Sequence, residues 1–344
     1  MVCHTENPMQ LKALNTFGIA ATAQRFVPIN TLADIHYFLT NPTFQQLLPL
    51  RILGGGSNVL FCTEQINGTI LHNRLRGIEV VQQNTEYVWL RAASGENWHD
   101  LVQYALRHNW GGIENLSLIP GTVGAAPIQN IGAYGVELSH VLDTLSVIDL
   151  YNGQSQILSA ESCELGYRDS IFKRTAKDRY FITDITLRLS RRPQLQLQYG
   201  DIGRTLSDMG IGDKPTIQDV SEAVCRIRRS KLPDPKELGN AGSFFKNPEI
   251  DSQQYETLKT QFATMPAYPL PNGRVKIPAA WLIEQCQWRG RRQGDAGIHQ
   301  NHALVLVNYG AATGSQLLAL AQQIQTDIQQ KMGITLQPEV NIWE

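Results

Sequence analysis

The sequence predicts an α+β fold, in which helices and strands are mixed without the regular alternation of a doubly wound sheet. Segments with strand-like and helix-like apolar spacing follow one another irregularly along the chain. No GxGxxG sequence follows a predicted strand and opens a helix, so we do not expect a Rossmann dinucleotide site. The length of 344 residues exceeds one hydrophobic core and predicts two or three domains.

Composition indicates a globular enzyme and excludes several other classes. Apolar residues make up 42% and charged residues 18% of the chain, which argues against disorder. The net charge of −1 gives no support to a nucleic-acid or anionic-membrane partner. The five cysteines show no CxxC spacing, so neither a zinc site nor a disulfide framework is predicted. The polar start and the lack of a long apolar run predict a soluble, cytoplasmic protein.

The first part of the chain predicts short elements in quick succession. Thr31 is expected to N-cap a helix whose apolar residues share one face. Residues 50–53 and 59–61 have the composition of buried strands, and residues 87–92 alternate as a strand does. Asn97 then opens an amphipathic helix that a glycine pair ends.

The middle of the chain predicts a hairpin, a helix and a hinge. Residues 141–150 and 181–189 are strand-like, and Asn152 with the following glycine forms a hairpin signal after the first of them. Apolar residues at helical spacing from Ile217 predict a helix that ends before Pro233. Two prolines in residues 232–236 predict a domain hinge.

Beyond the hinge the pattern predicts two helices and two strands. A helix is expected near residues 278–286 and a strand at 303–308. A longer helix at 315–332 is ended by Gly333. Residues 335–343, which contain a proline, are expected to form a closing strand.

Two glycine-rich segments are candidate cofactor loops. Residues 54–58 (GGGSN) lie between two predicted strands, and their backbone amides can converge on a pyrophosphate. The alternative is a tight connector that needs glycine only for its turn. Residues 119–137 are small and nearly uncharged, which suits a large flat cofactor against the backbone. The alternative is a loop that packs only on protein, but long loops in compact domains are usually functional.

Three polar residues stand out in separate segments. Arg168 lies among apolar and aromatic neighbours, where it can neutralise a carboxylate, although a structural salt bridge with Asp169 is the alternative. Ser243 has small residues on one side and two phenylalanines on the other, which suits a hydroxyl in a dry pocket. Its alternative is a turn serine bonded to local backbone. Glu339 lies in a strand-like segment, where a solvated carboxylate is the default.

Other charged residues give weaker signals. The basic residues Arg226, Arg228, Arg229 and Lys231 can meet phosphates, but most such runs are solvated faces. Lys231 is singled out because it lies beside the hinge. The histidines show no metal-ligand spacing, so no metal site is predicted.

Six segments in order resemble one family. They are GGGSN, PGTVGAAPIQNIGAYG, GYRDSIF, KLPDPK, GNAGSFFKNP and PEV, and they resemble the UDP-N-acetylenolpyruvoylglucosamine reductases. Each motif alone is weak, whereas six in order, from about Asn15 to Glu339, are specific. The resemblance implies a three-domain FAD-binding fold similar to the vanillyl-alcohol-oxidase (PCMH-type) flavoproteins. Its domains would be residues 1–76 with 334–344 returning to it, 77–231, and a substrate-binding domain at 232–333.

The resemblance also implies an activity. The chain would reduce UDP-N-acetylglucosamine enolpyruvate to UDP-N-acetylmuramate in peptidoglycan precursor synthesis, with NADPH as electron donor and non-covalent FAD as carrier. Hydride would pass from flavin N5 to the enolpyruvyl methylene carbon, and Ser243 would protonate C2. Arg168 and Glu339 would flank the substrate carboxylate, and Glu339 would help only when protonated.

The remaining residues carried over by the resemblance bind cofactor or substrate. Those implied for FAD are Gly54, Gly55, Gly56, Ser57, Asn58, Pro120, Gly121, Gly124, Ala125, Asn130, Gly132 and Ala133. Those implied for the substrate are Tyr134, Tyr199, Lys231 and Asn247, and Tyr199 suggests the subgroup with a tyrosine loop over the substrate. His302 stands where some members have glutamine, so no role is assigned to it.

Two other readings stay open at this point. The chain can be another FAD oxidoreductase of the same fold, whose members often tether flavin through His or Cys. It can also be a nucleotide-sugar-binding protein without turnover. We expect a monomer that binds small molecules and neither nucleic acid nor membrane.

Overall fold

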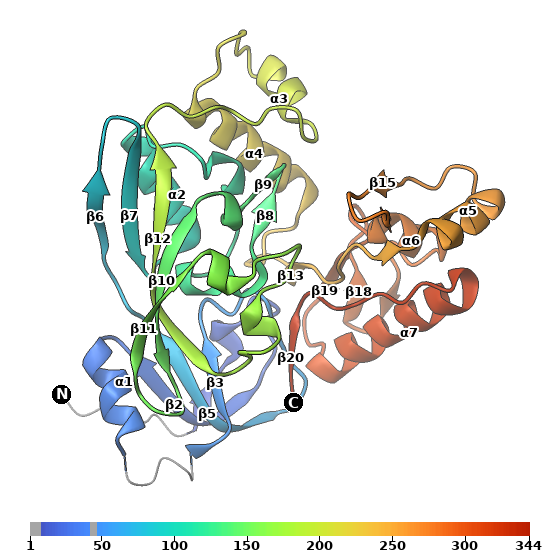
Figure 1. Cartoon of the computed structure of the whole chain (residues 1–344). Helices are drawn as coiled ribbons and strands as arrows, with labels where there is room; N and C mark the ends of the chain where they lie inside the picture. The colour runs from blue at the N-terminus through green and yellow to red at the C-terminus, as the bar shows by residue number, and fades with distance from the viewer. Residues whose placement is uncertain (1–7, 42–46) are drawn as a thin grey trace. The chain divides into compact units, whose positions relative to one another are not determined.

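The computed structural model describes residues 8–41 and 47–344 (Figure 1). Cys3 and the start of the predicted first domain lie outside these residues. The chain forms two compact units. The described residues of unit 1 are 8–9, 23–41, 47–55 and 67–230, and those of unit 2 are 10–22, 56–66 and 231–344. The predicted division into three domains stays a prediction.

The centre of unit 1 is an antiparallel sheet with strand order β11-β10-β12-β7-β6 (Figure 1). Its strands are β6 (Ile78–Gln83), β7 (Tyr87–Ala93), β10 (Leu142–Asp149), β11 (Ser155–Ser159) and β12 (Tyr180–Ser190). Strand β12 is buried along most of its length because it lies between β10 and β7. Gly153 (φ 72°) donates its N–H to Asp149 O in the turn between β10 and β11, so the predicted hairpin is confirmed.

Helix α2 (Trp98–Arg107) forms the predicted amphipathic element of unit 1. The Asn97 side chain caps it by accepting from Asp100 N. Five apolar side chains of α2 join the core of β7, β10 and β12. Trp98 also donates from Nε1 to Leu116 O (3.0 Å). This bond fixes the start of residues 114–137, from here on called the glycine-rich loop, against the helix.

A second sheet in the fold has the order β1-β2-β5-β3, with β3 parallel to β5. Its strands are β1 (Met9–Gln10), β2 (Thr22–Ile29), β3 (Leu50–Leu53) and β5 (Gln65–Asn73). Helix α1 (Leu32–Leu39) begins at the predicted cap, where Thr31 and Asp34 form a capping box. Its residues Ile35 and Phe38 pack on β2 and β5.

Two helices complete unit 1. Helices α3 (Ile202–Asp208) and α4 (Ile217–Lys231) pack on each other through a cluster of buried aliphatic side chains. Leu195 and Leu197, which precede α3, pack against this cluster. The segment that carries Tyr199 is thus anchored at its base.

Unit 2 contains a sheet of order β13-β19-β18-β17 covered by helix α7 (Gly314–Met332). The strands are β13 (Gly239–Ser243), β17 (Arg292–Gln293), β18 (Ala296–Ile298) and β19 (Val305–Asn308). Thr313 and Gln316 form the capping box of α7, and Gly333 (φ 66°) ends the helix as predicted. Unit 2 also holds α5 (Ser252–Gln261), α6 (Ala279–Gln285), β14 (Glu249–Ile250), β15 (Tyr268–Pro269) and β16 (Val275–Lys276).

The predicted closing strand is wrong over most of its length. Only β20 (Asn341–Trp343) is a strand, and it pairs in parallel with β4 (Val59–Phe61). Pro338 has no N–H for a ladder, and the residues around it instead bond to residues 244–246. In the described part of the chain, no helix is both long and apolar enough to cross a membrane.

Candidate active site

The glycine-rich loop of unit 1 is built from short turns. It contains η3 (Glu114–Leu116), η4 (Val123–Ala125), η5 (Pro127–Gln129) and the strand pair β8 (Gly132–Ala133) and β9 (Val136–Glu137). Leu118, Asn130 and Tyr134 have φ values of 58°, 44° and 50°. Such left-handed conformations are uncommon for residues with a β-carbon, so the loop has a specific, imposed shape.

Asn130 maintains this shape from inside. Its Nδ2 donates to Gly166 O (3.0 Å) and Glu137 Oε2 (2.9 Å), and its Oδ1 accepts from Ser139 N (2.9 Å). The side chain is fully buried. These bonds direct the side chain towards protein. The predicted contact of Asn130 with the cofactor stays a prediction.

Unit 1 brings the two predicted cofactor loops together. A β-carbon at Gly54 would collide with the Thr122 hydroxyl, and one at Gly55 would lie 3.2 Å from Gly121 Cα. The N–H groups of Gly55, Gly121 and Thr122 donate to no acceptor among the described residues. Amide donors on a surface without side chains suit the pyrophosphate of FAD.

Other predicted cofactor residues of this loop add an apolar surface. Pro120 and Ala125 are exposed, and Gly132 and Ala133 are partly exposed. Gly124 is buried, and its N–H donates to Ser94 O (2.8 Å). The small exposed residues can contact a flat apolar ring system, and the free amide N–H groups beside them can bind a phosphate.

The second half of the GGGSN segment belongs to unit 2. Gly56 (φ 63°) packs so closely that a β-carbon there would collide with Leu14 O. Asn58 donates from Nδ2 to Glu339 O (3.3 Å) and accepts at its backbone oxygen from Asn341 N (3.1 Å). Asn58 therefore holds the backbone of the segment that carries Glu339. Ser57, between them, is partly exposed.

Arg168 lies on a tight loop (φ 52°) that is docked on the glycine-rich loop. Ser170 Oγ donates to Ile128 O (2.7 Å), and Arg168 Nη2 donates to Gly132 O (2.7 Å). The structure thus places Arg168 beside a predicted cofactor residue. Asp169 forms a salt bridge with Arg174 (Nε–Oδ2, 2.8 Å).

Arg228 is a second guanidinium that sequence reasoning left among solvated charges. Its Nε donates to Leu118 O (3.2 Å) in the glycine-rich loop. Burial is the main cause that lowers the pKa of Arg228, and the charge of nearby Arg168 lowers it further. Within the described residues, no carboxylate forms an ion pair with it. Arg168 and Arg228 are both partly buried, and two guanidinium groups near each other can bind an anion.

The partial burial of Arg228 had a signal in the sequence. It follows Val224, a buried residue of α4, by four positions, which places both on one face of the helix. The position of Arg228 on this face of the helix predicts its environment better than its membership of a basic run does.

Ser243 ends strand β13 at an irregularity of the sheet. Gly242 (φ 71°) donates its N–H to Asn240 Oδ1 (2.9 Å), and Ser243 then pairs with Val305. The Ser243 hydroxyl makes no hydrogen bond with any residue that the structure describes. This argues against the alternative of a turn serine bonded to local backbone, and it leaves the hydroxyl available as a donor.

Unit 2 brings the backbone of Glu339 to Phe244, the residue after Ser243. Glu339 N donates to Phe244 O (2.7 Å), and Pro338 bridges to Phe245. The backbone segments that carry these two predicted catalytic residues are therefore hydrogen-bonded to each other, although they are distant in sequence. Glu339 is partly buried.

Lys231, Asn247 and His302 lie in the same unit. Asn247 Oδ1 accepts from Ala279 N (2.9 Å), which orients its amide at the start of α6. His302 Nδ1 accepts from Leu304 N (3.3 Å), and Leu304 O accepts from Phe244 N (2.8 Å). Burial, then the charges of His299 and Lys231, lower the pKa of His302. His302 and Lys231 are thus close to the strand that carries Ser243.

The two predicted substrate tyrosines meet in unit 1. A β-carbon at Gly135 would lie 3.4 Å from Tyr199 Cβ, and one at Gly200 would lie 3.6 Å from the Tyr134 ring. The Tyr199 side chain is exposed. Sequence reasoning assigned both tyrosines to the substrate without expecting this contact.

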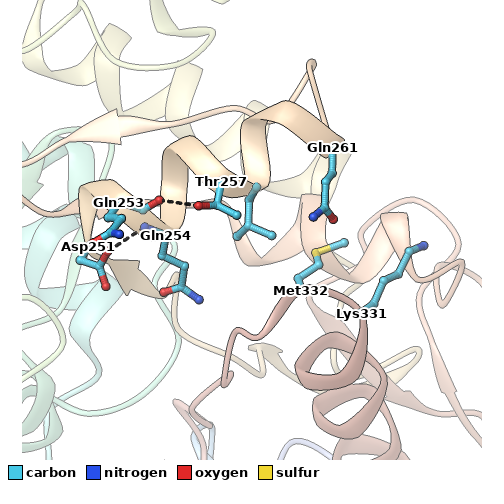
Figure 2. A pocket seen from close by; sticks show the side chains of 8 residues that line it. Asp251, Gln253, Gln254, Thr257, Gln261, Lys331 and Met332 are labelled. Carbon is cyan, nitrogen blue, oxygen red and sulfur yellow. Dashed lines mark hydrogen bonds between the residues drawn. The ribbon is translucent and has the colours of Figure 1, made fainter.

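An open hollow lies between α5 and the end of α7 (Figure 2). It is lined by Asp251, Gln253, Gln254, Thr257, Leu258, Gln261, Lys331 and Met332. Asp251 caps α5 by accepting from Gln254 N (2.7 Å), and Thr257 donates to Gln253 O (3.0 Å). These local bonds explain its polar lining, and it contains no predicted site residue. Across the described residues, no three potential metal ligands cluster.

Two family models match separate stretches of this chain. The family model described as UDP-N-acetylenolpyruvoylglucosamine reductase, C-terminal domain, matches residues 234–343, and one described as FAD binding domain matches residues 44–159. Proteins named UDP-N-acetylenolpyruvoylglucosamine reductase are similar over nearly their whole length. That of Chromobacterium violaceum is 48% identical (96% of this chain and 96% of the relative), and that of Pseudomonas aeruginosa is 46% identical (97% of each).

A solved structure supports the fold. The crystal structure of UDP-N-acetylenolpyruvylglucosamine reductase from Thermus caldophilus aligns with a TM-score of 0.68 at 24% identity, over 99% of this chain and 100% of that one.

Proposed function

Because this chain belongs to the UDP-N-acetylenolpyruvoylglucosamine reductase family, we propose that Ser243, Arg168 and Glu339 are its catalytic residues. The chain is an FAD-dependent oxidoreductase that reduces UDP-N-acetylglucosamine enolpyruvate with NADPH in peptidoglycan precursor synthesis. Its fold is the α+β FAD-binding fold with a separate C-terminal domain. The observation that supports the catalytic proposal best is that the Ser243 hydroxyl bonds no described residue, while Glu339 N bonds the carbonyl of the next residue, Phe244.

The glycine-rich segments of unit 1 are proposed to hold FAD without a covalent bond. The amides of Gly55, Gly121 and Thr122 would bind the pyrophosphate, since they have no acceptor among the described residues. The exposed Pro120 and Ala125 offer apolar contact to the cofactor. When bound, FAD supplies to the substrate the hydride that NADPH provides.

Charge must be stabilised when hydride reaches the enolpyruvyl methylene carbon. Negative charge then develops on C2 and on the substrate carboxylate. Arg168, oriented by Gly132 O, supplies fixed positive charge there. Glu339 assists in its protonated form, because an ionised carboxylate would repel the developing charge. The Ser243 hydroxyl then donates its proton to C2; a serine is a weak acid, but an enolate carbon is a strong enough base to accept it.

The substrate is proposed to be held by Tyr134, Tyr199, Lys231 and Asn247. Asn247 already accepts a bond at Oδ1, so its NH2 group is the part it offers to a ligand. Lys231 supplies a point charge for the diphosphate. We further propose a cytoplasmic monomer of three domains that acts on small molecules alone; the net charge of −1 supports the absence of a nucleic-acid partner.

The test is NADPH oxidation by the purified holoenzyme with and without UDP-N-acetylglucosamine enolpyruvate. We expect sustained oxidation only with this substrate, and a product that has gained one hydride and one proton by mass spectrometry. Denaturation should release free FAD. Flavin that stays on the denatured chain would favour another FAD oxidoreductase, and binding without NADPH oxidation would favour a nucleotide-sugar-binding protein.

A further inference from the structure

We propose that Asn115 is a positioning residue that holds Tyr134 and Tyr199 together as one substrate-recognition element. The inference rests on the proposed substrate role of these tyrosines. It goes beyond that role because Asn115 acts through the two loops and needs no contact with the substrate itself.

The side-chain amide of Asn115 joins two segments distant in sequence. Asn115 is fully buried in η3, and its Nδ2 donates to Tyr134 O and to Gln196 O, both at 2.9 Å. These bonds use both amide hydrogens. Turning the amide over would place its oxygen against two carbonyl oxygens, so its orientation is determined by the two bonds.

Each bond fixes a segment that carries a tyrosine. Tyr134 has a left-handed backbone (φ 50°), which is disfavoured for a residue with a β-carbon, and the bond to its carbonyl holds it there. Gln196 lies three residues before Tyr199. The rings then meet the opposite loop, since Tyr134 lies against Gly200 and Tyr199 lies against Gly135.

The arrangement suits a binding element better than a packed core. Leu195 and Leu197 anchor the base of the Tyr199 segment on α3 and α4, whereas the Tyr199 side chain is 58% exposed. Asn115 Oδ1 is buried without a partner among the described residues, which costs free energy of folding. Stability of the fold alone would not favour an asparagine with an unpaired oxygen at this position. A fixed base with a free tip reduces the ordering required when ligand binds.

The test uses Asn115→Leu, which keeps the size and removes both donors. The dissociation constant of UDP-N-acetylglucosamine enolpyruvate, measured on the oxidised holoenzyme by flavin absorbance, should rise about tenfold. FAD content should stay as in the wild type. Asn308→Leu is the matched control, because Asn308 is a buried asparagine of unit 2 that bonds Phe17 O and neither tyrosine.

A double-mutant cycle separates positioning from general packing. In a Tyr199→Ala background, Asn115→Leu should lose most of its effect on the dissociation constant. An unchanged constant in the single variant, or fully additive effects in the cycle, would overturn the proposal. Asn115→Asp is the second variant, because it is isosteric and places an oxygen against the two carbonyls. If both variants fail to fold, Asn115 is structural and the proposal is wrong.

A failure of the proposed function would look different. It would appear in the wild-type protein as no binding and no reduction of this substrate, before any variant is compared.

Discussion

Gly124→Ala is expected to weaken FAD binding about thirtyfold, which corresponds to about 2 kcal/mol. The added β-carbon would lie 2.5 Å from Ser94 Cβ and 3.2 Å from Ser94 O. Carbon atoms normally meet at about 3.5–4.0 Å. Because Gly124 N already donates to Ser94 O at 2.8 Å, the backbones cannot separate without losing that bond. Overpacking of this kind costs about 1–3 kcal/mol.

The predicted loss reaches FAD through the neighbouring amides. Relief of the overlap moves the loop that carries Gly121 and Thr122, whose N–H groups are proposed to bind the pyrophosphate. The assay is titration of apoprotein with FAD, followed by quenching of flavin fluorescence. Gly212→Ala is the matched control, since a β-carbon at Gly212 meets nothing within 4 Å. Equal FAD affinity in the two variants would refute the placement of FAD on this loop.

Two further variants test charge and pH. Arg168→Lys keeps a positive charge but loses the fork that Gly132 O orients, so substrate turnover should fall about 10²-fold with FAD content unchanged; wild-type turnover would contradict the proposed role. Burial, then the charges of Arg74 and Arg76, lower the pKa of His72 from 6.5 to about 4, so folding favours the neutral ring. The contribution of His72 to the free energy of unfolding is therefore fully present above pH 6.5 and is lost as the pH falls through 4. Because the ring is partly exposed, His72→Gln should remove only about 1–2 kcal/mol of this pH dependence in urea unfolding, and identical pH profiles would refute it.

Local signals in the sequence predicted the caps and turns. Thr31, Asn97 and Gly333 end or begin helices as expected, because capping depends on neighbours a few residues away. Strands β2 and β5 were missed because Pro28 and Gly68 interrupt them. Gly68 is needed there, since a β-carbon would collide with Pro49 O, a contact that the local pattern does not reveal.

The motifs predicted the candidate site residues one by one but not the contacts between the segments that carry them. The segments of Ser243 and Glu339 are joined by the bond of Glu339 N to Phe244 O, which no periodicity indicates. The docking of Arg168 on Gly132 depends in the same way on long-range hydrogen bonds. Asn115 was not predicted, because a buried asparagine acts through partners that only the fold supplies.

Rapid-reaction kinetics of Ser243→Ala test the catalytic proposal most directly. The serine hydroxyl bonds no described residue, so its removal should leave folding and FAD content unchanged. Ser252→Ala, which removes a hydroxyl bonded to Gly273 O, is the control. Flavin reduction by NADPH should proceed at a near-normal rate, and reoxidation by UDP-N-acetylglucosamine enolpyruvate should slow by about 10²–10⁴-fold. Reoxidation at the wild-type rate, or a collapse of the reduction step, would contradict the assignment of Ser243 as proton donor.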